Sequence, residues 1–258
     1  NETLIIRAHG VARAVYEKLA AQGNPVIDAT CPFVARIHKI AAEQTAAGRH
    51  IFIAGNPQHP EVQGIVGHCK GNCTVFRDKK ELKCLIDRSL PKRLAIVAQT
   101  TYNKLLWGEC IELLPSDHPD LQIFDTICSA TAARQSDADQ LSRRSDLMIV
   151  VGGRHSSNTV KLFDVCSRNC PAWLIETAEE LLAHANEIRQ KAAEIAAESV
   201  SGHVLKIGIT AGASTPAHII KEVQTNMSGI FDTDTTIPEN EDFAAAFEEE
   251  LDKTFTKK

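Results

Sequence analysis

Two short segments of the chain match each other, and their spacing constrains the fold more than any other feature. DATCPFV contains Cys31 and DTICSAT contains Cys128, and each places its cysteine three residues after an aspartate and just before a stretch with helical spacing. Gly55 follows the first cysteine by 24 residues, and Gly152 follows the second by the same 24 residues. Equal spacing between matching residues indicates repeated structural units.

Polar residues recur in the same register. His59 and Glu61 stand 28 and 30 residues after the first cysteine, and Ser156 and Asn158 stand 28 and 30 residues after the second. Each pair lies where a helix is expected to begin. Backbone N–H groups at a helix start, together with Ser, Asn and His donors, form an anion site, so we expect a phosphate-bearing ligand.

A second kind of segment, a strand followed by a small polar loop and a helix, occurs three times. The copies are IIRAHGVARAV with His9, AIVAQTTYNKL with Thr100 and Thr101, and IGITAGASTPAHII with Ser214. This strand–loop–helix segment, one half of a repeated unit, occurs three times, whereas the other half, which contains the cysteine, occurs only twice. The pattern therefore predicts a threefold pseudo-repeat whose first half-unit, with its own cysteine, would precede Asn1.

Short apolar runs that alternate with helical patterns predict an α/β fold with parallel sheets. The predicted strands are residues 3–8, 25–28, 50–55, 93–99, 121–125, 146–153, 172–176 and 204–210. The predicted division is 1–31 for the remnant of the first α/β unit, 32–124 for the second unit, 125–226 for the third, and 227–258 for a linker with an acidic amphipathic helix. Ligands of such sheets bind at the carboxyl ends of the strands.

Composition and charge exclude several classes of protein. The 258 residues carry a net charge of -5 with both signs spread along the chain, so there is no basic stripe for nucleic acid. No apolar run approaches the roughly 18 residues that a membrane span needs. The eight cysteines occur without a basic and apolar leader, which favours reduced thiols in a cytoplasmic protein.

If three units surround one centre, their strand-end cysteines face the same point, and three thiolates suit an iron-sulfur cluster or a soft metal. Glu61 is the only carboxylate at such a position in the repeated loops, which makes it the candidate proton donor. Each of these residues alone also fits a structural role, since single strand-end cysteines and histidines are mostly packing or hydrogen-bonding groups. Their joint placement favours a functional site.

The other cysteines offer a rival interpretation. Two C-x-x-x-C pairs, each inside or just after a helix-like run, would share a helix face and form a zinc site if they converged; we favour packing for them. These pairs are Cys69 with Cys73 and Cys166 with Cys170. Cys84 and Cys110 are expected in the core.

Seven motifs in order, RAHGV, DATCPFV, GNPQHPEVQGIVGH, QTT, DTICSATAARQ, GGRHSSNTVKL and GITAGASTP, resemble those of the 4-hydroxy-3-methylbut-2-enyl diphosphate reductase family over about residues 3–226. The resemblance implies a trefoil of three α/β units, the first incomplete here, around a central 4Fe-4S iron-sulfur cluster. It also implies removal of the allylic hydroxyl of the substrate to give isopentenyl and dimethylallyl diphosphate, with electrons from a ferredoxin or flavodoxin.

The same resemblance implies roles for individual residues, carried over motif by motif. Cys31 and Cys128 would be the second and third cluster ligands, Glu61 would deliver protons to the departing hydroxyl, and Thr100 would place the substrate hydroxymethyl group. The residues that would bind the diphosphate are His9, His59, Ser156, Ser157, Asn158 and Ser214.

Three departures from the family pattern stand out. The N-terminal motif with the first cluster cysteine has no counterpart, so the chain is expected to be a fragment that cannot hold a stable cluster. Residues 177–200 form a longer helical insertion than the family predicts, interpreted as an exposed helix. The C-terminal segment after Asn226 carries Phe243, Phe247, Leu251 and Phe255 at spacings of four.

These four apolar residues fit either a helix that docks on its own domain or a segment that precedes RNA-binding OB-fold repeats, with which some bacterial members of the family are fused. RNA binding would then belong only to an absent downstream domain. The hypothesis that competes with the enzyme is a cluster-free remnant that only binds an anion, or the anchoring part of a translation-linked fusion.

Overall fold

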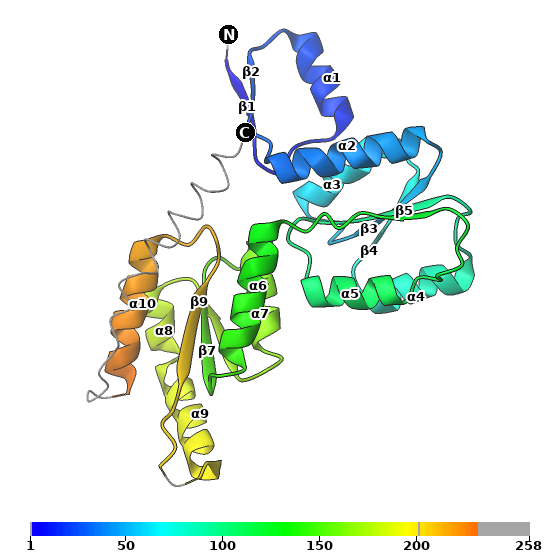
Figure 1. Ribbon diagram of the computed structural model, residues 1–258. Coiled ribbons are helices and arrows are strands. Elements are labelled where there is room, and N and C mark those ends of the chain that lie inside the picture. The colour runs from blue at the N-terminus through cyan, green and yellow to red at the C-terminus, as the bar shows by residue number, and fades with distance from the viewer. Residues whose placement is uncertain (1, 201, 232–258) are drawn as a thin grey trace. The chain divides into compact units, whose positions relative to one another are not determined.

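The computed structural model of the protein describes residues 2–200 and 202–231, and it divides the chain into two compact units, residues 1–136 and 137–258. All paired strands in both units are parallel (Figure 1). The α/β fold class expected from the sequence is confirmed. The division into three repeated units remains a prediction.

Unit 1 contains a two-stranded sheet with strand order β1-β2 and a four-stranded sheet with strand order β4-β3-β5-β6. Its elements are β1 (Leu4–Ile6), α1 (Arg13–Gln22), β2 (Val26–Asp28), α2 (Pro32–Ala46), β3 (His50–Ala54), α3 (Pro60–His68), β4 (Cys73–Phe76), α4 (Lys79–Arg88), β5 (Leu94–Ala98), α5 (Lys104–Glu112), β6 (Leu121–Ile123) and the first part of α6 (Ser129–Ser142).

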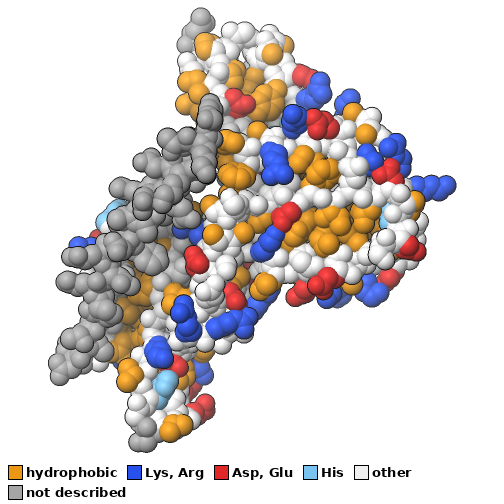
Figure 2. All heavy atoms as spheres, in the orientation of Figure 1, with side chains coloured by type: hydrophobic (Ala, Val, Ile, Leu, Met, Phe, Trp, Pro, Cys, Tyr) orange, Lys and Arg blue, Asp and Glu red, His pale blue; other side chains and the backbone are white. Residues whose placement is uncertain are grey.

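Unit 2 contains a three-stranded sheet with strand order β8-β7-β9. Its elements are the rest of α6, β7 (Leu147–Val151), α7 (Ser157–Cys166), β8 (Ala172–Ile175), α8 (Ala178–Ala183), α9 (Ala185–Glu198), β9 (Ile207–Ala211) and α10 (Ala217–Ile230). Figure 2 shows basic and acidic side chains intermixed on the visible face, in agreement with the absence of a basic stripe in the sequence.

The central strands form the core because they are buried on both faces. Every residue of β5 and of β7 is buried, as a parallel strand between two helical layers requires. One cluster around Phe52, Leu94 and Trp107 packs on one face of the four-stranded sheet, and a second around Ile37, Ile53 and Val97 packs on the other. Burial of these side chains is the main force that holds the strand ends in place.

All eight predicted strands are confirmed, but β4 was missed. The sequence interpretation placed Cys69 and Cys73 on one helix face, and this is wrong. Helix α3 ends at His68, a turn with positive φ at Lys70 and Gly71 follows, and Cys73 is the first residue of β4. The CTVF strand is only four residues long, so its apolar pattern is too short to separate from the end of the preceding helix.

Helix starts and stops agree well with the sequence. Pro32 opens α2 directly after Cys31, because a proline at the first helical position loses no hydrogen bond. Gly48 ends the same helix region with φ of 79°, a conformation that glycine adopts at little cost. His59 and Ser156 cap the N-termini of α3 and α7, as expected.

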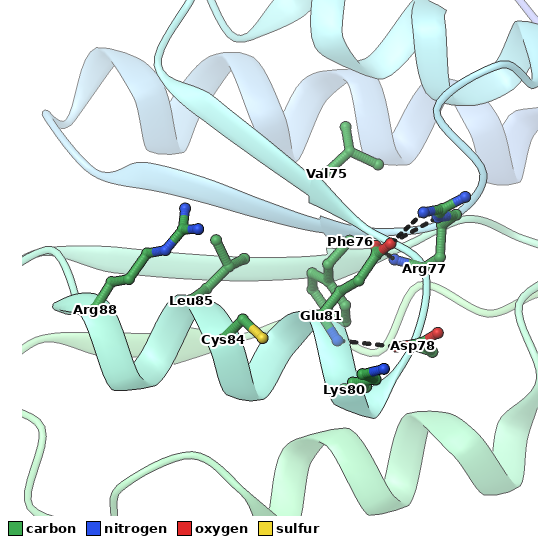
Figure 3. A pocket seen from close by; sticks show the side chains of 9 residues that line it. All are labelled: Val75, Phe76, Arg77, Asp78, Lys80, Glu81, Cys84, Leu85 and Arg88. Carbon is green, nitrogen blue, oxygen red and sulfur yellow. Dashed lines mark hydrogen bonds and ion pairs between the residues drawn. The ribbon is translucent and has the colours of Figure 1, made fainter.

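Cys84 departs from the expected core position. Cys110 is fully buried, as predicted, but Cys84 is exposed on α4. Figure 3 shows its thiol beside a shallow surface pocket of about 490 Å³ between the end of β4 and α4. The other face of α4 carries Leu82 into the core, so an amphipathic helix of this length leaves Cys84 on its outer side.

Residues 177–200 form two helices, α8 and α9, and the interpretation of one exposed helix is wrong. Leu181 and Ile188 are fully buried in the core of unit 2. Propensity predicted the helices but carried no information on which face packs. At the C-terminus α10 reaches Ile230, and Phe243, Phe247, Leu251 and Phe255 lie outside the described residues.

Within residues 2–200 and 202–231, no helix has both the length and the apolar composition to cross a membrane.

Alanine substitution of two adjacent leucines tests which face of α8 packs into the core. Leu181→Ala is expected to lower the free energy of unfolding by about 2–5 kcal/mol, because it leaves a cavity in the core of unit 2. Leu182 is 51% exposed, so Leu182→Ala is expected to change the free energy by less than about 0.5 kcal/mol. Urea unfolding followed by circular dichroism measures both, and equal effects would contradict the packing described here.

Candidate functional site

The carboxyl ends of the strands in unit 1 carry most of the predicted site residues. Strand β3 leads to Gly55 and β5 leads to Gln99, and the two strands pair with Ala54 opposite Ala98. The Gln99 N–H donates to the Ala54 carbonyl at 2.8 Å, which continues the ladder beyond the strands. The loops that follow β3 and β5 are therefore held side by side.

Glu61 and Thr100 form the central pair of this site. The Thr100 backbone N–H donates to Glu61 Oε1 at 2.6 Å, and the Thr100 hydroxyl donates to Oε2 at 2.7 Å. Glu61 is 1% exposed and Thr100 is 7% exposed. The structure thus brings together the two residues to which the sequence assigned catalysis.

Burial changes the proton affinity of Glu61. Removal of the carboxyl from water raises its pKa above the ordinary value, because the charged form loses hydration. The two hydrogen bonds from Thr100 act in the opposite direction, since they stabilise the carboxylate, but the effect of burial is larger. Such a carboxyl holds its proton to higher pH than an exposed glutamate and suits a proton donor.

His9 and His59 lie next to each other, with ring centroids 5.1 Å apart and an edge-to-face arrangement. The Glu61 N–H donates to His59 Nδ1 at 3.2 Å, so the proton of the neutral ring is assigned to Nε2. Burial and the nearby His9 lower the pKa of His59. Two imidazoles from different loops thus stand together at the strand ends, as an anion site needs.

Cys31 and Cys128 have matching local structures. The Ala35 N–H donates to the Cys31 carbonyl and the Ala132 N–H donates to the Cys128 carbonyl, both at 2.9 Å, and a helix follows each cysteine. Both thiols are free and partly exposed. A thiolate is the metal-binding form of cysteine, and the N-terminus of a helix favours negative charge.

Backbone hydrogen bonds tie each cysteine to another site loop. The Cys31 N–H donates to the Ala8 carbonyl, next to His9, and the Cys128 N–H donates to the Thr100 carbonyl, both at 3.0 Å. The cysteines are therefore attached to the loops that carry a histidine and the Glu61–Thr100 pair.

The donor set for a metal cofactor is only partly present in the described chain. Two free thiols fit an iron-sulfur cluster in chemistry, but no three His, Cys, Asp or Glu side chains gather as a metal site among the described residues. Cys69 and Cys73 lie in unit 1 and Cys166 and Cys170 in unit 2.

Unit 2 holds the remaining four predicted residues. Ser156 caps α7, Ser157 and Asn158 are its first two residues, and Ser214 lies on the exposed loop between β9 and α10. The Thr215 hydroxyl donates to the Val151 carbonyl at 3.0 Å and so ties that loop to the end of β7. Three of the four residues thus share one helix start.

Asn158 carries an observation that points to a ligand. Both polar atoms of its side-chain amide are buried and have no hydrogen-bond partner in the structure. Buried amides are nearly always paired, because an unpaired one costs free energy. A polar ligand is one means by which Asn158 gains its partners.

Gln99 and Thr126 were not selected from the sequence. Gln99 is 3% exposed, and its side chain accepts from the Asn56 N–H and donates to the Thr101 hydroxyl. Thr126 binds both backbone groups of Ala98 through its hydroxyl and so attaches the Cys128 loop to β5. A polar residue directly after a fully apolar strand is the signal that identifies Gln99, whereas no such signal marks Thr126, which lies three residues after β6.

Comparison with known proteins identifies the family. The family model described as LytB protein matches residues 1–228. The chain belongs to the LytB protein family.

Relatives within the LytB family are reductases by name. The chain is 42% identical over 224 residues to the 4-hydroxy-3-methylbut-2-enyl diphosphate reductase of Thermoanaerobacter sp. (strain X514), an alignment over 86% of this chain and 72% of the relative. It is 40% identical over 226 residues to the protein of the same name from Caldanaerobacter subterraneus subsp. tengcongensis, with the same two shares of 86% and 72%.

Solved structures agree with the LytB assignment. A structure of (E)-4-hydroxy-3-methyl-but-2-enyl diphosphate reductase, described as the terminal enzyme of the non-mevalonate pathway, is 33% identical, covers 88% of this chain and 76% of the other, and has a TM-score of 0.51. The E-1-hydroxy-2-methyl-but-2-enyl-4-diphosphate reductase of Plasmodium falciparum is 24% identical, with 96% and 78% covered and a TM-score of 0.73, which supports the fold.

The raised pKa of Glu61 in this LytB-family chain predicts how stability depends on pH. Above pH 4.5, the ordinary pKa of a glutamate, the Glu61 carboxyl loses its proton in the unfolded state but keeps it in the folded state. The contribution of Glu61 to stability therefore falls as the pH rises. Glu61→Gln removes the titration, and its stability relative to wild type is expected to rise as the pH is increased above 4.5.

Guanidinium unfolding at several pH values measures this difference. Glu112→Gln, at an exposed position on α5, serves as the control and is expected to show a smaller pH dependence relative to wild type. A Glu61→Gln curve that stays parallel to wild type over the whole range would refute the assignment.

Proposed function

We propose that the chain acts as a 4-hydroxy-3-methylbut-2-enyl diphosphate reductase, the activity in the names of its relatives. The observation that carries this proposal is the buried Glu61 carboxyl, bonded twice by Thr100, whose carbonyl in turn accepts from the Cys128 N–H. A proton source on α3, a hydroxyl after β5 and the backbone of a cysteine segment after β6 are thus joined by hydrogen bonds at the carboxyl ends of neighbouring strands.

The reaction removes an allylic hydroxyl as water. The substrate C–OH bond breaks, two electrons and two protons are taken up, and the products are water and the alkenes isopentenyl and dimethylallyl diphosphate. A departing hydroxide is a poor leaving group, so a proton must reach its oxygen as the bond breaks. Glu61 is suited to this step because burial keeps the proton on its carboxyl.

Thr100 would orient both the substrate and Glu61. In the structure the Thr100 hydroxyl donates to the Glu61 carboxylate. When Glu61 is protonated, the Thr100 hydroxyl oxygen can accept a hydrogen bond from the Glu61 proton and donate its own proton to a substrate oxygen. The Thr100 N–H keeps Oε1 in place during this exchange. The hydroxymethyl group of the substrate would therefore lie beside the Thr100 hydroxyl.

Each unit carries candidate donors for a diphosphate. In unit 1 these are His9 and His59, of which His59 has its Nε2 proton to donate. In unit 2 they are Ser156, Ser157, Asn158 and Ser214, where the unpaired Asn158 amide supports the assignment. The N-terminus of α7 adds backbone N–H groups and a favourable dipole for the anion.

Cys31 and Cys128 would be ligands of a 4Fe-4S cluster. When bound, such a cluster supplies electrons one at a time to the substrate. The protein contribution that the structure describes is the attachment of each cysteine to a site loop through its backbone N–H. Electrons would come from a ferredoxin or flavodoxin, and the proposed location is the cytoplasm.

A second candidate function is anion binding without redox chemistry. It is favoured by the ligand set, since only two matched cysteines accompany the histidine pair and the α7 start among the described residues. Iron uptake distinguishes the two functions.

Iron content is the first test. Iron and sulfide are supplied anaerobically to this chain and to the product of the full gene, followed by iron determination and EPR after reduction. The reductase proposal predicts about four irons per full-length protein, with loss on Cys31→Ser or Cys128→Ser. Cys84→Ser, at an exposed thiol on α4, is the control and is expected to retain iron. If neither protein takes up iron, the anion-binding function replaces the reductase.

Turnover tests the role of Glu61. In the reconstituted full-length protein with a chemical reductant, Glu61→Gln is expected to lower kcat by about 10²–10⁴-fold, because the amide accepts from the Thr100 N–H but delivers no proton. Iron content is expected to stay the same. A kcat within about twofold of wild type would exclude Glu61 as the proton donor.

A further inference from the structure

His38 is the buried imidazole that the proposed reaction does not use. It lies on α2, seven residues after Cys31 and so on nearly the same face of the helix, and it is 5% exposed. Its ring stacks on His68 of α3, with centroids 4.3 Å apart and planes 21° apart. The stack joins the helix that begins after Cys31 to the helix that begins after His59.

Two glycines make close contact with the His38 ring. A Cβ atom on Gly10 would lie 2.6 Å from His38 Cε1, and a Cβ atom on Gly64 would lie 3.0 Å from His38 Nε2. Gly10 follows His9 directly and has a φ of +63°, and Gly64 lies on α3 five residues after His59. The ring therefore fills the space between the His9 loop and α3, and no side chain larger than hydrogen fits at either glycine without movement.

The His38 ring is held by packing contacts. His38 Nε2 is buried and has no hydrogen-bond partner in the structure. Burial, and then the neighbouring His68, lower the pKa of His38 to about 4, so the ring is neutral at physiological pH. The groups around it are His68 on α3, whose Nε2–H donates to the Val11 carbonyl at 3.1 Å, and Asp28 and Tyr16 beyond it.

We infer that His38 is a positioning residue that holds His9, His59 and Cys31 in one arrangement. The flat ring sets the distance between three segments: the His9 loop through Gly10, α3 through Gly64 and His68, and its own helix, which begins after Cys31. The identity of the ligand that this arrangement serves rests on the proposed function.

The experiment compares His38→Ala, His38→Phe and Ile37→Ala in this chain. Alanine opens the space between the glycines, whereas phenylalanine keeps a flat ring and the stack but has no ring nitrogen. Ile37 is fully buried on the same helix and packs into the sheet-side core, so Ile37→Ala lowers stability without removing the contact with either glycine. Thermal unfolding verifies that the alanine variants are destabilised to a similar extent.

The first readout is the proton NOE between the His9 and His59 rings, measured by NMR on histidine-labelled protein. The second is the affinity for inorganic pyrophosphate, measured by calorimetry. His38→Ala is expected to abolish the NOE and to weaken pyrophosphate binding about tenfold, since donors fixed in place lose less freedom on binding. His38→Phe and Ile37→Ala are expected to keep the NOE and to bind within about threefold of wild type.

An unchanged NOE between the His9 and His59 rings in His38→Ala overturns the inference. If Ile37→Ala loses this NOE to the same degree as His38→Ala, the inference is also overturned, because the effect is then one of general stability. If His38→Ala does not fold, His38→Leu replaces it, because leucine fills more of the space but is not flat. If wild type does not bind pyrophosphate, the proposed diphosphate site fails, while the NOE still decides the role of His38.

Discussion

The register of β3 against β5 is the constraint on which the site depends. With Ala54 opposite Ala98, the two strands end together, and Glu61 on the following helix meets Thr100 on the following loop. A shift of one residue would turn every buried side chain of β5 to the other face of the sheet, so the apolar cores on both faces fix this register. The position of the hydrogen bonds between Glu61 and Thr100 is thus determined by packing that extends along the whole sheet.

A carboxyl at this position costs stability, and the local structure offsets only part of the cost. Burial disfavours the charged form of Glu61, while two short hydrogen bonds from Thr100 and a place in the first turn of α3 favour it. An apolar residue would cost less free energy of folding at a position so little exposed to water. A carboxyl at this buried position agrees with a chemical role, because a proton that is held by burial can be released when a ligand changes the local charge.

The sequence predicted the strands and selected the candidate site residues because both depend on repeated patterns. Eight strands and the helix starts at His59 and Ser156 follow from apolar runs and capping residues, and equal spacing selected Cys31 and Cys128. β4 was missed because four residues carry too little pattern. The solvent exposure of Cys84 and the burial of His38 were not predicted either, since both depend on which helix face meets a neighbour far away in the sequence.

The two helix starts have the same backbone arrangement but carry different side chains. His59 and Ser156 are N-caps, and Glu61 and Asn158 occupy the second position of α3 and α7. Both positions offer the same backbone donors and dipole, so the difference lies in the side chains. A carboxylate left unpaired in such a buried place would be far more costly than an amide, and Glu61 indeed has two donors whereas the Asn158 amide has none. The titratable group is therefore placed where the protein completes its hydrogen bonds, and the neutral group where the protein leaves its amide without a partner.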